Sequence, residues 1–190
     1  MANVDPTLEE RIGAALDAGD VTAAATLGLR GYGPQILGYL TVVLHERDLA
    51  EDAFSVFAED MWRGLDGFRR GASFRTWAYK LAYHAALRVL RDPEHRRGVT
   101  LQTSAASNLA AAVRSETPLH LRTETKTSIQ KLREELTADE QTLLVLRIDR
   151  RLDWREVAEV LDMEEPALRK RFERLREKLR RLVQERGLLD

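Results

Sequence analysis

Apolar residues recur at steps of three and four along most of the chain, a pattern typical of helices with one buried side. In the first half it predicts a helix over residues 20–44. The run Gly31-Tyr32-Gly33-Pro34 interrupts this helix, and we expect a boundary between two helices there. A third helix follows, with Asp48 as its cap and Glu51 closing a capping box.

Three glycines between residues 64 and 71 then predict a short loop. Ser73 is the expected cap of a fourth helix, Phe74 to Arg91, which ends before Pro93. Its aromatic residues share a face, so part of this helix should pack into a core.

The pattern changes after residue 97. Residues 98–128 are rich in Ser and Thr and include Pro118, which indicates a linker, with a helical turn expected near 108–113. Because ~30 extended residues reach about 100 Å, the helical parts on either side need not touch. We therefore expect an all-α protein with domains at 1–97 and 129–190 joined by this flexible linker.

Helix-start signals are clear in the second part. Thr137 and Glu140 form a capping box, and Asp153 caps a short helix over 154–161. A turn then leads into a long helix from Glu165, with a proline in its first turn, where proline is tolerated.

Composition narrows the class of protein. The 190 residues are 44% hydrophobic, which excludes global disorder, and only 11 Gly and 5 Pro argue against an all-β fold. Without cysteine there is no disulfide and no thiolate metal site. No signal peptide is visible, and the longest apolar stretch, residues 36–44, is too short to span a bilayer. We expect a cytoplasmic protein without membrane insertion.

The net charge of −1 hides a strong asymmetry. Residues 1–62 hold three basic and eleven acidic side chains, residues 63–98 nine basic and three acidic, and residues 165–186 nine basic and four acidic. Basic stretches attract polyanions, of which nucleic acid is the commonest. Arg-rich helices can also serve only solubility, so charge alone leaves both interpretations open.

Catalytic signatures are missing from the sequence. The four histidines lack metal-ligand spacing, and there is neither a phosphate-binding glycine loop nor a G-x-S-x-G motif. The carboxylate pairs Glu51-Asp52 and Glu59-Asp60 are expected on the exposed side of a helix, facing water or a basic partner. We expect no enzyme activity, no cofactor and no metal ion.

A helix-turn-helix is the most specific prediction. Val157, Ala158 and Leu161 of the short helix would pack against Leu168 and Phe172 of the long one. The opposite side of the long helix would then be free to enter a major groove, where Arg binds guanine bidentately or grips phosphates. A helical hairpin with a solvated basic face, or a short coiled coil, would give a similar pattern.

The segment 68–84 interleaves cations with aromatic residues. Cations can follow phosphates while aromatic rings stack on unpaired bases. Aromatic residues at helical spacing are usually core, however, and both interpretations stay open for Trp77.

The order of these parts resembles bacterial sigma factors of the extracytoplasmic-function group, which bring RNA polymerase to promoters. Such factors carry an Ala-Glu-Asp-led helix ending in Trp, here Ala50-Glu51-Asp52 to Trp62. A Phe-x-x-Trp-Leu-Tyr helix follows, here Phe74 to His84. After the linker comes a helix-turn-helix, here Leu146 to Arg171. The match spans most of the chain.

The resemblance implies core RNA polymerase and promoter DNA as partners, allows for an anti-sigma protein, and assigns three sets of residues. Minus-thirty-five contacts fall to Arg169, Lys170, Arg171, Glu173, Arg174 and Arg176. Minus-ten contacts fall to Arg70, Phe74, Arg75, Trp77, Tyr79, Lys80, His84 and Arg88. Polymerase contacts fall to Glu51, Asp52, Ser55, Glu59, Asp60 and Trp62.

Departures from the family pattern concern mainly these sites. Ser55-Val56 replaces the usual Gln-Glu, and His84 replaces an Asn that helps to hold a flipped base. Asp162 stands for the usual Gly in the helix-turn-helix turn, and Pro166-Ala167 for a Gly-Thr pair. Polymerase affinity and promoter choice are therefore the least transferable features.

Two other functions stay open. One is an ordinary helix-turn-helix regulator whose first domain senses a ligand, and which would bind duplex DNA without polymerase. The other is a helical interaction protein derived from a sigma factor that has lost promoter activity. Transcription by core polymerase with and without the chain would separate these from a working sigma factor.

Overall fold

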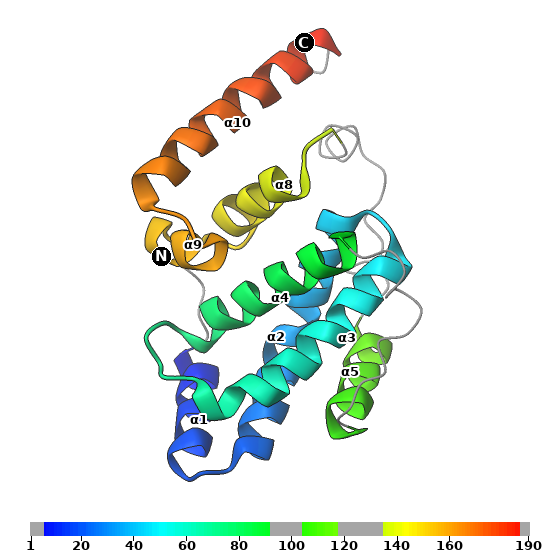
Figure 1. The fold of residues 1–190 in the computed structure, drawn as a ribbon, viewed down its shortest axis with the longest axis vertical. Helices are drawn as coiled ribbons and strands as arrows, with labels where there is room; N and C mark the ends of the chain where they lie inside the picture. The colour runs from blue at the N-terminus through cyan, green and yellow to red at the C-terminus, as the bar shows by residue number, and fades with distance from the viewer. Residues whose placement is uncertain (1–5, 92–103, 118–134, 187–190) are drawn as a thin grey trace.

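The computed structural model describes residues 6–91, 104–117 and 135–186. These residues form helices and turns with no strand among them, which confirms the all-α fold (Figure 1). The first group contains α1 (Pro6–Asp17), α2 (Val21–Leu44), α3 (Arg47–Gly64), α4 (Phe74–Arg91) and α5 (Ser104–Glu116). The second contains α8 (Ala138–Leu144), a π-helical turn (Val145–Asp149), α9 (Trp154–Leu161) and α10 (Glu165–Glu185).

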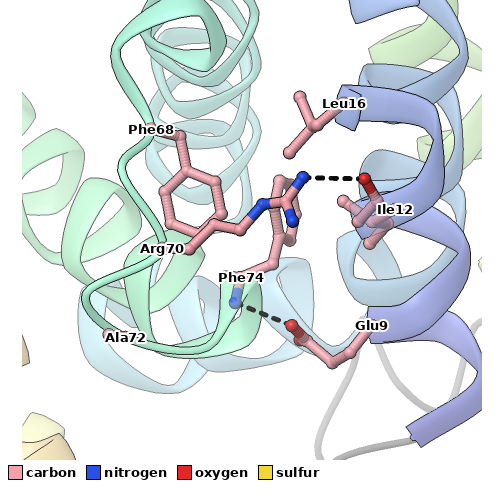
Figure 2. Close-up of a pocket in the computed structure, with 8 residues that line it drawn as sticks. Glu9, Ile12, Leu16, Phe68, Arg70, Ala72 and Phe74 are labelled. Carbon is pink, nitrogen blue, oxygen red and sulfur yellow. Dashed lines mark hydrogen bonds between the residues drawn. The ribbon is translucent and has the colours of Figure 1, made fainter. Parts of the chain in front are cut away.

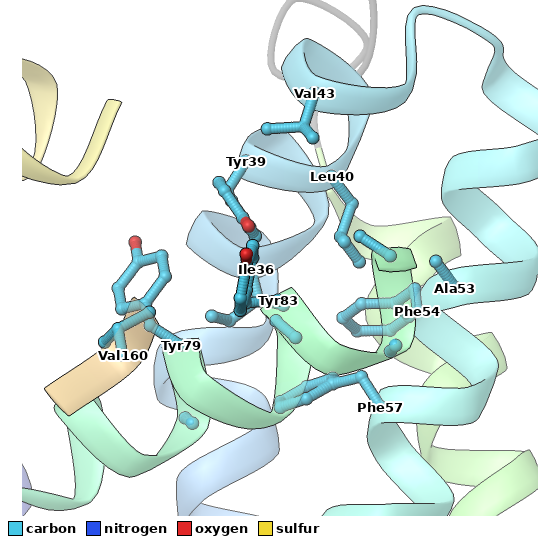
Figure 3. Close-up of a cluster of buried hydrophobic side chains, with 14 of the residues drawn as sticks. Ile36, Tyr39, Leu40, Val43, Ala53, Phe54, Phe57, Tyr79, Tyr83 and Val160 are labelled. Atoms are coloured by element: carbon cyan, nitrogen blue, oxygen red, sulfur yellow. The ribbon is translucent and has the colours of Figure 1, made fainter. Parts of the chain in front are cut away.

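The core of the first group lies where α2, α3 and α4 meet (Figure 3). Large side chains from all three helices are almost fully buried there, among them Ile36, Tyr39, Phe54, Phe57 and Tyr79. Burying each such side chain stabilises the fold by about 1.5–3 kcal/mol. The three- and four-residue apolar spacing therefore marks a real core, as the sequence predicts.

Helix α2 runs without a break through the Gly31–Pro34 run, so the expected boundary is wrong. A proline inside a helix costs about 3 kcal/mol in isolation. Here the flanking glycines admit neighbouring side chains instead of ending the helix. A methyl group on Gly28 would collide with the Phe74 ring of α4, and one on Gly33 would lie 2.8 Å from Val113 Cγ1 of α5. Tertiary packing overrides the local signal.

Most of these helices begin directly after a residue whose side chain caps the first turn. Asp20 accepts from the Ala23 amide at 2.9 Å, Ser73 accepts from the Thr76 amide, and Thr137 and Asp153 each open a complete capping box. The exception is α3, which begins at Arg47 without a side-chain cap, so the expected role of Asp48 is wrong. Glu51 bonds Arg47 at 2.8 Å instead of closing a capping box.

Helix α1 was not expected from the acidic start of the chain. Its Glu9 carboxylate accepts from the Tyr32 hydroxyl at 2.6 Å and from the backbone amides of Phe74 and Arg75 at 2.8 and 2.9 Å. Glu9 thus caps the N-terminus of α4 from another helix, where a negative charge is favourable. The partners lie 23 to 66 positions away in sequence, so no local pattern could reveal this cap.

The two helical groups pack against each other, although the sequence left them free to stay apart. Helix α9 packs against α4, and α8 contacts α2 (Figure 1). Part of the expected linker is also ordered, because α5 spans Ser104–Glu116 and packs on α2 and α3. The remaining expected linker residues, 98–103 and 118–128, lie outside the described residues.

Candidate nucleic-acid interface

The helix-turn-helix packs as its sequence predicts. Val157 and Leu161 of α9 are buried, as are Leu168 and Phe172 of α10, while Ala158 is half-buried. The Trp154 and Phe172 rings meet edge to face with centroids 5.3 Å apart. This packing leaves the opposite side of α10 to solvent.

That exposed side of α10 carries most of the cations expected to read the minus-thirty-five element. Arg169, Lys170, Arg174 and Arg176 are exposed. Arg169 and Arg176 pair with acids of the same helix, Glu165 at 2.5 Å and Glu173 at 3.1 Å. Arg171 differs, because its guanidinium is half-buried against Asp139 of α8 at 2.8 Å.

Two guanidinium groups contact the Trp154 indole. Arg147 and Arg169 stand 4.8 and 4.9 Å from the ring centroid. Such cation–π contacts are worth about 0.5–1 kcal/mol at exposed sites. They hold Arg169 in a defined direction at the start of α10, the end that a recognition helix presents to base edges.

In α4, three of the residues expected to contact minus-ten DNA are core residues in this structure. Phe74, Arg75 and Tyr79 are 1%, 2% and 0% exposed. Phe74 stacks on Tyr32 with centroids 6.0 Å apart, and Tyr79 meets Tyr39 edge to face. Their spacing puts them on the side of α4 that faces α2 and the second helical group. They position the helix rather than present themselves to solvent.

The remaining basic side chains of this set lie nearer the surface, and each has a carboxylate partner. Lys80 Nζ lies 2.5 Å and His84 Nε2 3.1 Å from the Asp162 carboxylate, and Arg88 lies 3.1 Å from Asp60. Trp77 is half-buried against Phe68, with centroids 4.8 Å apart.

Arg70 borders a small pocket between α1 and the loop before α4 (Figure 2). The residue adopts a left-handed backbone conformation, φ 55°, and its guanidinium binds the Gly13 carbonyl at 2.8 Å and the Asp17 carboxylate at 2.7 Å. The pocket holds about 80 Å³ and is lined by Glu9, Ile12, Gly13, Leu16, Phe68, Arg70, Ala72 and Phe74. Its walls combine two aromatic rings with the Arg70 guanidinium and with the Glu9 carboxylate that caps α4.

Helix α3 presents the acids expected to bind polymerase, with one correction. Glu59 is only 7% exposed and pairs with Arg63 at 2.9 Å, so the expectation that it is exposed is wrong. It falls on the buried arc of α3 between Ala58 and Met61. Glu51, Asp52, Ser55, Asp60 and Trp62 are partly exposed.

Helix α5 covers one end of this α3 surface. Arg114 Nη1 lies 2.5 Å from the Ser55 hydroxyl and 3.4 Å from the Glu51 carbonyl. Ser55 also donates back to the Glu51 carbonyl at 2.9 Å. Ser55, which departs from the family pattern on α3, therefore accepts a hydrogen bond from Arg114 of the expected linker.

A buried cationic cluster lies between the two helical groups. Arg75 donates to the Arg150 carbonyl at 2.9 Å, and Arg150 donates to the Gln35 carbonyl of α2 at 3.3 Å. The Arg75 guanidinium stands 5.7 Å from the centroid of the Tyr79 ring. Burial raises the pKa of the Tyr79 hydroxyl, against the opposing effect of Arg150 and Arg75. Sequence reasoning missed Arg150 because its partners lie 75 and 115 positions away.

Within the described ranges there is no candidate metal site and no candidate membrane-spanning helix. No group of three or more His, Asp or Glu there could hold a metal ion. Across the same residues, no helix combines the length and the apolar character that a bilayer crossing requires.

Comparison with known proteins agrees with the site. The family model for sigma-70 region 2 matches residues 29–97. The chain is 27% identical over 188 residues to the RNA polymerase sigma-H factor of Pseudomonas aeruginosa, covering 95% of this chain and 94% of that protein. It is 32% identical over 143 residues to the RNA polymerase sigma factor YlaC of Bacillus subtilis, covering 70% and 76%. With a sigma-70 region 2 helical group followed by a helix-turn-helix, this chain belongs to the sigma-70 family of RNA polymerase sigma factors, in the extracytoplasmic-function group.

Proposed function

We propose that this chain directs core RNA polymerase to specific promoters for the initiation of transcription. The observation that carries the proposal is the exposed basic side of α10, on a packed helix-turn-helix with Arg169 fixed against Trp154. An oriented guanidinium loses less conformational freedom when it binds a base bidentately. In this role residues 129–190 read the minus-thirty-five element.

The first helical group, residues 1–97, then reads the minus-ten element and binds polymerase. Lys80, His84 and Arg88 form the surface row of α4, and the buried Phe74, Arg75 and Tyr79 hold that row in place. Arg70 and Trp77 supply a cation and a ring beside the pocket before α4. A row of basic side chains next to an aromatic wall suits a melted strand with unpaired bases.

Polymerase binding falls to the partly exposed acids of α3. We choose Asp52 and Asp60 for the test, and not Glu59, because Glu59 is buried. Reversing Asp52 and Asp60 together should weaken binding to core polymerase without unfolding the chain. Each surface ion pair is worth only about 0–1 kcal/mol, so both changes are needed. Unchanged retention of polymerase at low salt would contradict this docking surface.

The proposed setting is the bacterial cytoplasm, with the factor on the nucleoid while it is bound to polymerase. An anti-sigma protein is a further proposed partner. Membership of the family supports both proposals, and they stand apart from the DNA contacts argued above.

The decisive experiment is transcription by core polymerase on a pool of genomic fragments, with and without the chain. A sigma factor should produce new start sites that share two sequence elements about 25 base pairs apart. Binding of duplex DNA without polymerase, and no new start sites, would favour the helix-turn-helix regulator instead. Neither DNA binding nor new start sites would favour the interaction protein.

A further inference from the structure

Two arginines meet below the surface where α4 packs against the second helical group. Arg75 of α4 is 2% exposed, and its Nη2 donates to the Arg150 carbonyl at 2.9 Å. Arg150 directly follows the π-helical turn, and its own Nη2 donates to the Gln35 carbonyl of α2 at 3.3 Å. The hydrogen-bond acceptors of both guanidinium groups are therefore backbone carbonyls, which carry no formal charge.

Both guanidinium groups also keep buried donors that no group accepts from. Nε and Nη1 of Arg75 and Nε of Arg150 have no hydrogen-bond partner within the described ranges. The hydroxyl of Tyr79 (Figure 3), one turn along α4 from Arg75, is likewise buried without a partner. Burial raises the pKa of Tyr79, so its hydroxyl stays protonated and able to donate. The charges of Arg150 and Arg75 both act on this hydroxyl, so the three side chains lie close together.

The positive charge of this cluster has no partner of opposite sign. Guanidinium groups stay protonated at every pH at which proteins are folded. Neither Arg75 nor Arg150 forms an ion pair in the part of the chain that the structure describes. Two acids that contact this turn of α4 bind other groups, because Glu9 accepts from the Arg75 backbone amide and Glu156 from the Thr76 hydroxyl. Since buried charges in proteins are normally paired, the cluster requires a counter-ion.

The burial of the donors limits which anion can serve. Arg75 and Tyr79 are 2% and 0% exposed, so the phosphate of a DNA strand cannot reach them in this arrangement of helices. A small free ion can be enclosed. One negative charge is sufficient, because the two carbonyl oxygens already oppose part of the positive charge. A halide accepts from N–H and O–H donors in any direction, which suits donors that come from three side chains.

We propose that Arg75, Arg150 and Tyr79 bind a small monovalent anion of the size of chloride. The anion accepts from the unpartnered guanidinium nitrogens and from the hydroxyl, and it compensates the two positive charges. It links α4 to the π-helical turn and, through Arg150, to α2. The inference goes beyond the proposed function and does not depend on it, because neither DNA nor polymerase takes part.

The first measurement is the melting temperature of the full chain, followed by circular dichroism. Sodium chloride replaces sodium gluconate at constant ionic strength, so that screening of surface charges stays the same. We expect a dissociation constant of about 10 mM, so about 200 mM chloride should raise the melting temperature by about 4–7 °C. A rise of less than about 1 °C would overturn the site and leave water as the partner of these donors.

Arg150→Gln is the test variant for this measurement, because it removes one of the two charges at a half-buried position. Arg155→Gln is the matched control, with the same change of charge at an exposed position of α9. The control should keep the chloride response of wild type, whereas Arg150→Gln should lose most of it. Equal responses in the two variants would overturn the site, because chloride would then act elsewhere on the protein.

Tyr79→Phe is a milder variant, which removes only the hydroxyl and keeps the ring beside Tyr39. In gluconate it should melt no lower than wild type, because it deletes a buried donor that has no acceptor. In about 200 mM chloride it should melt below wild type, because the ion has lost one of its donors. The same chloride response in Tyr79→Phe and in wild type would overturn the three-residue site.

The second measurement detects the ion itself, through the line width of the chloride NMR signal. Chloride that exchanges between water and a protein site gives a broader line. Wild type and Arg155→Gln should broaden the line equally, and Arg150→Gln should broaden it less than half as much. Equal broadening by all three proteins, or none by wild type, would overturn the proposal.

Discussion

The basic helices α4 and α10 look alike in sequence, but the exposed arginines of α10 differ from Lys80 and His84 of α4 in where they find partners. On α10, Arg169 and Arg176 pair with acids three or four positions away on the same exposed surface. On α4, Lys80 and His84 pair with Asp162, about eighty positions away. Ion pairs within one helix partly neutralise its surface but leave it exposed to solvent. Ion pairs with residues distant in sequence bring another element onto the surface. A count of charges cannot distinguish the two cases.

The largest effect is expected from an aromatic core residue of α4. Phe74→Ala should lower the free energy of unfolding by about 3–5 kcal/mol, because it empties the space beside Gly28 and Tyr32. Chemical denaturation followed by circular dichroism measures this loss. A fully folded variant that loses only DNA binding would show that Phe74 is a contact residue and not core.

On α10, Arg169→Ala should weaken promoter binding by about 1–3 kcal/mol, confined to particular bases of the minus-thirty-five element. The direction set by Trp154 predicts a base contact. Arg176→Ala is the companion variant, and it should weaken all sequences about equally if it contacts phosphate. Affinities for a panel of substituted duplexes provide the comparison. No effect of Arg169→Ala on any duplex would contradict the recognition helix.

A third kind of contact joins α5, which is part of the expected linker, to α3. Arg114→Ala should increase proteolytic cleavage within α5 and change the free energy of unfolding by no more than about 1 kcal/mol, since the contact is partly exposed. Arg155→Ala, at an exposed position of α9, is the control. Equal cleavage rates in both variants would show that Arg114 does not hold α5 on α3.

His84 provides the smallest effect. His84→Asn should shift the preferred base at one minus-ten position without abolishing activity. Imidazole can stack but cannot present the adjacent donor and acceptor of an amide. Selection from a randomised minus-ten library, with core polymerase and each protein, measures the preference. Identical preferences would leave His84 with only its contact to Asp162.

Local signals predicted much of the fold. The capping box at Thr137 and the caps at Asp153 and Ser73 involve residues three positions apart, so the sequence alone predicts them. The Asp20 cap and the Glu156 half of the Asp153 box have the same spacing but were not predicted. The packing of α9 against α10 follows from apolar spacing for the same reason.

Features set by distant partners escaped prediction. Glu9 on α4, Arg150 beside Arg75, and Asp162 on His84 each join residues more than 60 positions apart. The site residues divide in the same way, into those set by local spacing and those set by distant partners. Exposed cations of α10 were foreseeable from helical spacing, whereas the burial of Arg75 depends on a second helical group whose position no local pattern encodes.

The glycines of α2 have one more consequence, which concerns how the protein can change over time. Gly28 admits α4 and Gly33 admits α5, each through the room left by one missing methyl group. A Gly→Ala change needs a single nucleotide substitution. The attachment of α5 can thus be loosened at position 33 while Gly28 keeps α4 in place. Selection can therefore change how firmly α5 covers α3 separately from the packing of the core.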